Sequence, residues 1–415
     1  MVEEKEGFRN RLQTGRETRG LIMEFYQGML KAKKEGKPII WIPPLGGIAE
    51  ILYAMDVQPV IPEHFGPLCA AMNLAPKYFE ASEARGYSRD LCGYLRAELG
   101  YLYDSFGKKT LFDLPKPDLL IAFVGCMSNF KTWQGFQDFF QVPTFWMDQG
   151  VFGGPGGLIM NAEAAIEYGV LMFRRIVSFI EKYTGRKLDE DRLKEVAKLS
   201  DRASELFGEI QDFRKIVPAP YTMSDISIMF PMVALTGTQK AVDFLTKVRD
   251  EVKERVEQGI GAIENERFRL LWDNVPIWHN IKLFHYFEQK GAAVVADTYT
   301  RAWTGRIDIT KPIESAVKKV LLPVAVLAGI PTLDRKIDWV LRMVRSHHID
   351  GAVLFSNRSC KPLSHGQLDL KDALERELNV PSLLFEADHM DVRNYSEAQI
   401  KGRIDAFIEL LESRT

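Results

Sequence analysis

The sequence predicts an α/β fold in which two parallel-sheet domains are joined by a helical region. Short apolar runs typical of buried strands alternate with helical periodicity in both halves of the chain. A long middle stretch carries helical periodicity with few strand signals. The 415 residues, 46% of them hydrophobic, are also too many for one ordinary core. We therefore expect two sheets of the Rossmann or flavodoxin-like type.

The first half of the chain contains four strand patterns. Spaced apolar residues between 8 and 36 predict an amphipathic helix, so residues 1–37 form a helical lead-in. Apolar runs then predict strands at 38–42, 57–61, 118–124 and 144–147, with a helix at 48–55 after the first of them. Residues 38–161 are accordingly predicted to be the first α/β domain.

The second half repeats this architecture after a helical connector. Residues 162–264 contain helical segments at 164–183, 191–207 and 238–258. Strand patterns return at 268–272, 293–296, 351–355 and 382–385, so residues 265–415 are predicted to be the second α/β domain. No residue-level repeat relates the two halves.

Composition narrows the class of function. Lys and Arg total 54 against 56 Asp and Glu, a net charge of −2, which favours neither nucleic acid nor an anionic membrane as a partner. The charged N-terminus has no apolar signal-peptide region, and no apolar run approaches the ~20 residues of a membrane span. We expect a cytoplasmic protein whose four cysteines are thiols available to a metal.

Two cysteines lie beyond the carboxyl ends of strands, where ligands collect in parallel-sheet domains, and a third lies near a helix start. Cys126 follows the strand at 118–124, and Cys360 follows the strand at 351–355 after a short loop. Cys92 lies near a helix start that we expect Ser88 or Asp90 to cap. Their wide spacing matches no local metal motif, so buried, inert cysteines remain an alternative. Helix starts and three nearby arginines are expected to lower the thiol pKa values: Arg89, Arg96 and Arg358.

The context of these cysteines carries a family resemblance. Four separated strings are involved: 83–96 (EARGYSRDLCGYLR), 124–126 (VGC), 356–360 (SNRSC) and 384–396 (LFEADHMDVRNYS). Together, and in this order, they resemble the 2-hydroxyacyl-CoA dehydratase / benzoyl-CoA reductase superfamily. The resemblance extends from about residue 38 to the end of the chain.

The resemblance implies a cofactor and its ligands. In this family three cysteines of each subunit bind a [4Fe–4S] cluster, and Cys92, Cys126 and Cys360 match those positions one by one. The fourth iron site is left open or bridged, which leaves a Lewis-acid site for a substrate oxygen. Cys69 matches no ligand motif and is expected to be a small core residue.

The resemblance also implies a reaction and partners. The family removes water from a 2-hydroxyacyl-CoA through one-electron chemistry in which the thioester becomes a ketyl radical anion. The electron comes from a separate ATP-hydrolysing iron–sulfur activator, and the enzymes usually pair two homologous subunits. This chain has no Gly-x-x-x-x-Gly-Lys-Ser/Thr phosphate loop, so dependence on an activator is expected.

Three further residues are candidates for proton handling. Glu63 lies beyond the strand at 57–61, matches the family's strand-Pro-Glu segment and could relay a proton to the departing hydroxyl. His64 could share the relay, and His365, which follows Cys360, could donate a hydrogen bond to cluster or substrate. The alternatives are a helix N-terminal charge for Glu63 and packing or surface roles for a lone histidine.

Several functions remain open at this stage. The 45–47 segment, Leu-Gly-Gly, lacks the hydroxyl residue that dehydratases often place there, which keeps a dearomatising benzoyl-CoA-type reductase in consideration. A homodimer with a sulfur-bridged double-cubane cluster is a second alternative. A non-catalytic electron-transfer or scaffold subunit and a cluster-free CoA-binding module are the others.

Overall fold

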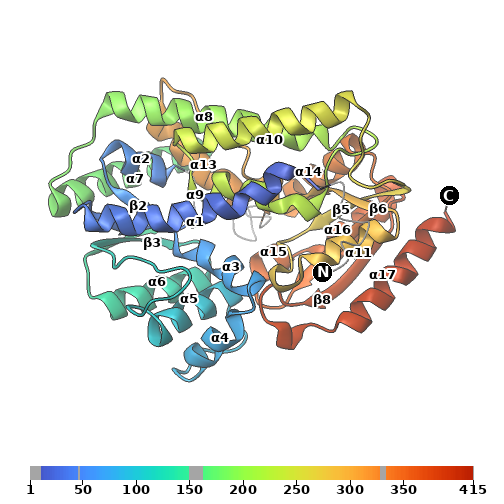
Figure 1. The fold of residues 1–415 in the computed structure, drawn as a ribbon, viewed down its shortest axis with the longest axis horizontal. Coiled ribbons are helices and arrows are strands. Elements are labelled where there is room, and N and C mark those ends of the chain that lie inside the picture. Colours follow the sequence, from blue (N-terminus) through green and yellow to red (C-terminus); the bar gives the residue numbers. More distant parts are fainter. Residues whose placement is uncertain (1–10, 45–46, 149–161, 328–332, 415) are drawn as a thin grey trace.

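Two parallel four-stranded sheets organise the molecule (Figure 1). The structure is a computed structural model, which describes residues 11–44, 47–148, 162–327 and 333–414. The first sheet has the strand order β2-β1-β3-β4 and the second β6-β5-β7-β8. All eight predicted strands are confirmed: β1 (Ile39–Trp41), β2 (Gln58–Val60), β3 (Leu119–Val124), β4 (Thr144–Asp148), β5 (Phe268–Asp273), β6 (Ala292–Asp297), β7 (Gly351–Asn357) and β8 (Ser382–Ala387).

The strands form where apolar residues run without alternation, because helices cover both faces of each sheet. In β3 the five residues from Leu119 to Phe123 are buried, and in β5 all six are buried. Parallel pairing sets the carboxyl ends of neighbouring strands at one edge, with Val124 of β3 opposite the end of β4. The loops after β3 and β7 therefore emerge at the ligand-binding edges of their sheets.

Helices of the first half surround the first sheet. The lead-in helix and the helix after β1 are confirmed as α1 (Gln13–Lys34) and α2 (Ile48–Ala54). A 3-10 turn, η2 (Pro62–His64), follows β2. The remaining helices of this half are α3 (Phe65–Ala71), α4 (Ala75–Glu83), α5 (Gly93–Asp104) and α6 (Met127–Phe140).

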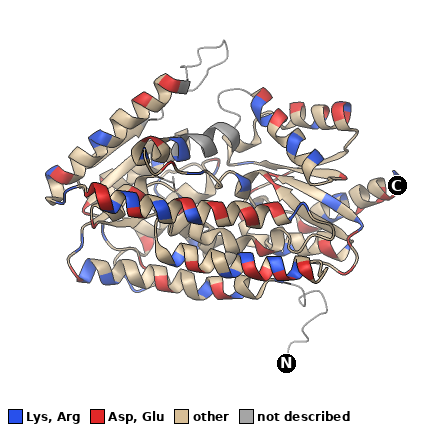
Figure 2. Ribbon diagram, turned by 90° about the horizontal axis from the view of Figure 1, so that it is seen from above, with Lys and Arg blue, Asp and Glu red and all other residues tan. Residues whose placement is uncertain are grey.

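The middle of the chain is helical, as its periodicity predicts. It contains α7 (Ala162–Thr184), α8 (Glu190–Phe213), η3 (Met223–Met229), α9 (Phe230–Ala234) and α10 (Gln239–Glu257). The long helices α8 and α10 pack against each other along the top of Figure 1, and α1 packs against α10 and η3. Asp189 and Thr238 cap the N-termini of α8 and α10 with their side-chain oxygens. Lys, Arg, Asp and Glu are interspersed along the helices in Figure 2.

The second sheet carries the remaining elements. They are η4 (Trp278–Asn280), α11 (Lys282–Gln289), α12 (Thr298–Arg301), α13 (Pro312–Leu327), α14 (Leu333–Ser346), α15 (Lys361–Ser364), α16 (Gln367–Leu378), η5 (Val392–Asn394) and α17 (Glu397–Glu412). Helix α13 reaches back to the first half, where it packs against α7. A Cβ on Gly47, whose φ is +98°, would lie 2.4 Å from the carbonyl oxygen of Ala316 on that helix.

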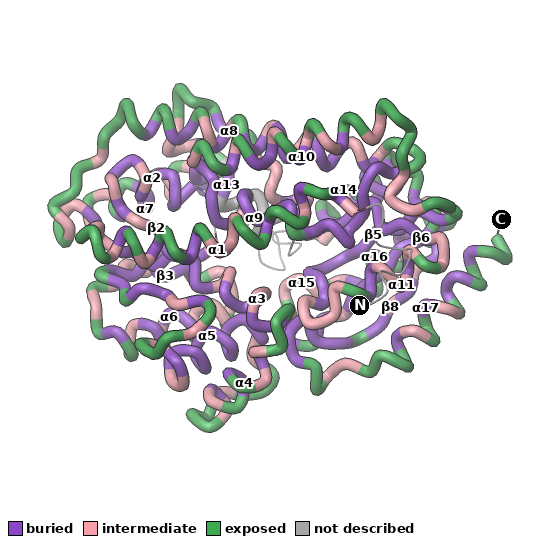
Figure 3. The backbone as a smooth tube through the Cα atoms, viewed as in Figure 1, coloured by how far each residue is buried: buried purple, intermediate pink, exposed green. Residues whose placement is uncertain are grey.

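One buried cluster runs through both halves of the molecule. It includes Trp41 of the first sheet and Trp272 of the second, both at most 1% exposed. In Figure 3 the strands of both sheets are coloured mostly as buried. The division at residues 37, 161 and 264 stays a prediction. Within the described residues, no helix combines the length and apolarity that crossing a membrane requires.

Candidate functional site

A cavity of about 520 Å³ lies between the two halves of the molecule. Its wall brings together Cys92, Cys126 and Cys360, which come from three separate segments of the chain. The remaining wall is largely apolar and aromatic, and includes Phe230 and Trp278. Three of the four cysteines thus converge, whereas Cys69 is fully buried in the hydrophobic core, in agreement with its expected role.

Each of the three cysteines is the N-cap residue of the helix or turn that follows it. Cys92 precedes α5, Cys126 precedes α6 and Cys360 precedes the single turn α15. The Sγ atom of Cys126 accepts a hydrogen bond from the backbone N–H of Asn129 at 3.4 Å. The helix start at Cys92 was predicted correctly, but the expected caps Ser88 and Asp90 were wrong. The Ser88 hydroxyl instead accepts from the N–H of Asp90, inside the preceding loop.

Burial dominates the electrostatics of these thiols. It raises the pKa of Cys92 well above its usual value, and that of Cys360 to about 12. The neighbouring cysteines and Glu63 add to the rise at Cys92, while backbone N–H groups at the helix starts oppose it. The expectation that arginines lower these pKa values was wrong. While the cysteines are thiols, no guanidinium contact among the described residues offsets the rise in pKa that burial causes.

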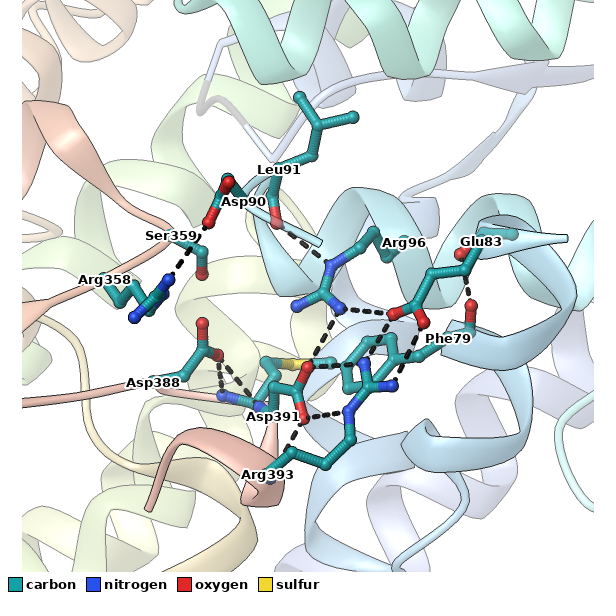
Figure 4. A network of polar contacts seen from close by, with 12 residues as sticks. Phe79, Glu83, Asp90, Leu91, Arg96, Arg358, Ser359, Asp388, Asp391 and Arg393 are labelled. Atoms are coloured by element: carbon teal, nitrogen blue, oxygen red, sulfur yellow. Dashed lines mark hydrogen bonds and ion pairs between the residues drawn. The ribbon is translucent and has the colours of Figure 1, made fainter. Parts of the chain in front are cut away.

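The arginines are bound elsewhere (Figure 4). The guanidinium of Arg96 is fully buried and donates to Glu83 Oε1 at 3.1 Å and Asp391 Oδ2 at 2.9 Å. Its Nε donates to the carbonyl oxygen of Leu91, next to Cys92. Arg358 pairs with Asp90 across the cleft at 3.4 Å. These contacts connect the Cys92 segment with the second half of the molecule.

His389 is a site residue that the sequence reasoning missed. It is 1% exposed, lines the cavity, and its Nε2 lies 3.8 Å from the Sγ of Cys92. Its Nδ1 lies 3.1 Å from Asn357 Oδ1 and 3.4 Å from the Ser359 hydroxyl. Gly93 permits this approach, because a Cβ there would lie 2.6 Å from the Cβ of Met390. The Asp-His pair at the end of β8 was the only signal in the sequence.

Glu63 and His64 lie on the same cavity wall, where η2 follows β2. Burial raises the pKa of Glu63 to about 7, although a hydrogen bond from the Asn129 side chain opposes the rise. Burial lowers the pKa of His64 to about 3, so this imidazole is neutral near pH 7. His64 contacts Phe230, with ring centroids 4.7 Å apart, and lies 3.4 Å from the Tyr26 hydroxyl.

Glu98 is a second carboxyl group in the cavity wall that the sequence did not single out. It lies on α5 and is 4% exposed, and its Oε1 has no hydrogen-bond partner among the described residues. Burial raises the pKa of Glu98 well above its usual value, and Glu63 adds to the rise. Helical periodicity does not single it out, because every residue of α5 from Gly93 to Leu102 is buried.

His365 is separate from this group. It lies at the end of α15, is exposed, and is not part of the cavity wall. The nearby residues that face inward are Pro362 and Leu363. Leu45 and Gly46, on which the comparison with a dehydratase hydroxyl depends, lie outside the described residues.

Three thiols on one cavity wall are the type of donor that an iron–sulfur cluster requires. Among the residues that the structure describes, no three His, Cys, Asp or Glu side chains lie close enough together to bind one metal ion. Thiolates on one Zn²⁺ stand about 2.3 Å from it and therefore close to each other. A [4Fe–4S] cube binds each thiolate at a different iron, so its ligand sulfurs stand farther apart.

Comparison with known proteins finds similarity over most of the chain. The family model for 2-hydroxyglutaryl-CoA dehydratase, D-component, matches residues 48–411. The (R)-phenyllactyl-CoA dehydratase alpha subunit of Clostridium sporogenes is 27% identical over 398 residues, 93% of this chain and 92% of that protein. A benzoyl-CoA reductase subunit of Thauera aromatica is 24% identical over 414 residues, 95% of this chain and 93% of that protein. The (R)-2-hydroxyisocaproyl-CoA dehydratase alpha subunit of Clostridioides difficile is 24% identical over 402 residues, 95% of each chain. The chain belongs to the 2-hydroxyglutaryl-CoA dehydratase D-component family.

Proposed function

We propose that the chain is the [4Fe–4S] subunit of an acyl-CoA dehydratase, with Cys92, Cys126 and Cys360 as the cluster ligands. The observation that carries the proposal is the convergence of these thiols on one cavity in a chain of this family. Thiolates are the ligands that iron–sulfur clusters require. When bound, the cluster would supply one electron to the thioester carbonyl of a 2-hydroxyacyl-CoA.

The surroundings of the cysteines fit such a cluster. Helix starts direct backbone N–H groups at the sulfurs: that of Tyr94 toward Cys92, and that of Asn129 toward Cys126. These partial positive charges stabilise thiolates and the net negative charge of a cluster. When the cluster binds, iron replaces the thiol protons. The iron compensates the thiolate charge, which burial would otherwise disfavour.

The chain's own residues would handle the protons of the reaction. With a pKa raised to about 7, Glu63 is half protonated near neutral pH and can both give and take a proton. Asn129 orients its carboxyl group through the side-chain hydrogen bond. His64 is neutral and packed between aromatic rings, so we assign it a hydrogen-bonding role beside Glu63. His365 is left out, because it is exposed and outside the cavity wall.

The names of the relatives support the proposal that this chain works with partner subunits. Each relative is named as one subunit of an enzyme, which implies that those proteins work with further subunits. We propose that this chain pairs with a homologous sister subunit and takes electrons from an ATP-hydrolysing iron–sulfur activator.

The test is anaerobic purification of the full chain, with any co-purifying subunit retained, followed by iron and acid-labile sulfide analysis. We expect about four irons and four sulfides per chain, following the cluster stoichiometry. Cys92→Ala, Cys126→Ala and Cys360→Ala should each lose most of this iron. Cys69→Ala, which removes a core thiol, is the matched control and should keep it. Equal iron in all four variants would contradict the ligand assignment.

The same preparation separates the alternatives. About eight irons and nine sulfides per homodimer, with the ninth sulfide bridging the two cubes, would indicate the double-cubane protein instead. A dearomatised ring formed from benzoyl-CoA, in place of a 2-enoyl thioester, would assign the reductase activity. Iron without any exchangeable site would indicate an electron-transfer subunit.

A further inference from the structure

Glu98 is an acid in the cavity wall that the proposed function does not use. Glu98 points into the cavity wall from α5, and its Oε1 is buried without a hydrogen-bond partner in the described part of the chain. Glu98 is 4% exposed and belongs to the cavity wall, so a ligand in the cavity can supply a partner for this otherwise costly buried carboxyl group. The groups that interact electrostatically with Glu98 are Glu63, Tyr26 and Cys69, and none of them carries a positive charge.

The cavity wall that includes Glu98 is largely apolar. Ile22, Leu95, Ile226 and Phe230 are among the residues that line it. Arg11 also borders the cavity, but its guanidinium faces Asp225 at 3.6 Å. A ligand group bound here therefore meets hydrocarbon and two carboxyl groups, and no free cation of the described cavity wall compensates an anion.

We propose that this cavity selects acyl-CoA thioesters whose acyl group is uncharged and apolar, and that Glu98 donates a hydrogen bond to an oxygen of that acyl group. This inference rests on the proposed acyl-CoA function. The protonated carboxyl group is the form that burial and the neighbouring Glu63 favour. Its O–H would donate to the ligand oxygen, and the ligand would supply the partner that the carboxyl group lacks.

The same geometry excludes acyl groups that end in a carboxylate. A carboxylate on the acyl group would lose its hydration in a largely apolar wall without a free cation among the described residues, and Glu63 would repel it when ionised. Aromatic or branched aliphatic acyl groups have no charge to desolvate, and moving their apolar surface out of water favours binding. Discrimination of this kind depends on repulsion of the wrong ligand as well as attraction of the right one.

The experiment measures binding without turnover. Anaerobically purified full-length protein, with no activator present, is titrated with 3-phenylpropionyl-CoA, 4-methylpentanoyl-CoA and glutaryl-CoA. Calorimetry and the fluorescence of the cavity residues Trp278 and Trp303 report the dissociation constants. We expect glutaryl-CoA to bind at least about tenfold more weakly than the two apolar thioesters.

Variants test the hydrogen bond. Glu98→Leu should weaken binding of the apolar thioesters about three- to tenfold, while Glu98→Gln, which keeps a donor of similar shape, should bind nearly as the parent does. Asp104→Asn is the matched control, because it removes an acid at the end of the same helix, paired with Lys77 at the surface. It should leave all dissociation constants unchanged.

The outcomes separate this inference from the proposed function. Equal or tighter binding of glutaryl-CoA, or full affinity in Glu98→Leu, overturns the inference even when the iron content is as expected. Absence of iron together with the expected order of affinities overturns the cluster assignment and leaves the inference standing. Failure of every thioester to bind overturns the inference.

Discussion

Replacing Arg96 by Met should destabilise the protein and loosen the segment that carries Cys92. The Arg96 side chain is fully buried and makes three hydrogen bonds, to Leu91 O, Glu83 Oε1 and Asp391 Oδ2. Removing one partner from a buried charge pair costs about 3–5 kcal/mol, because the remaining carboxylate loses its compensation. Arg393 still contacts both carboxylates, so we expect a loss near the lower end, about 3 kcal/mol.

This loss can be measured as a shift in the melting temperature. With an unfolding entropy of about 2.1 cal/mol/K per residue over 415 residues, a loss of about 3 kcal/mol lowers Tm by about 3–4 °C. Anaerobic scanning calorimetry is the assay, with iron content per chain as the second readout. Because the lost Nε donates to the carbonyl oxygen of Leu91, next to Cys92, we also expect iron content to fall.

The matched control is Arg393→Met. Arg393 contacts the same two carboxylates, Glu83 and Asp391, but its side chain is 31% exposed. Solvent screens such pairs, so the variant should lose only about 1 kcal/mol. The reasoning is refuted if Arg393→Met costs as much stability as Arg96→Met, since burial would then not decide the energy.

Three further predictions follow from individual contacts. Burial raises the pKa of Asp225 to about 7, above the unfolded value of about 3.9. Its contribution to stability is therefore present below pH ~4 and lost as the pH rises through 7; Asp225→Asn should flatten this slope in urea unfolding, and an unchanged slope would contradict it. Gly93→Ala should cost about 1–3 kcal/mol through overpacking, whereas Gly208→Ala, with nothing within 4 Å, should gain up to about 1 kcal/mol; equal effects would refute the packing argument. His389→Phe should keep the iron but lower the reduction potential of the proposed cluster, because a hydrocarbon ring replaces the polar imidazole 3.8 Å from the Cys92 sulfur and stabilises added negative charge less; an unchanged potential in a redox titration would contradict this.

Patterns local in sequence predicted the fold well. Apolar runs bounded by turns predicted all eight strands, and helical periodicity predicted α1, α7, α8 and α10. These signals are reliable because both patterns are local. A strand covered on both faces is a continuous apolar run, and an amphipathic helix has apolar residues at helical spacing. Helix caps were less predictable, since either Ser88 or Asp90 has suitable chemistry, and only the backbone course at Cys92 decides which residue is the cap.

The sequence alone determined which elements form and which cysteines lie beyond strand ends or at helix starts. Only the tertiary structure decided which side chains share the cavity. His389 meets Cys92 across 297 residues, and Arg96 meets Asp391 across 295, whereas His365, close to Cys360 in sequence, lies outside the cavity wall. Proximity along the chain says little about contact between two sheets, because the packing of one half against the other sets those distances. The pKa values of Glu63 and Glu98 likewise depend on burial that no local pattern records.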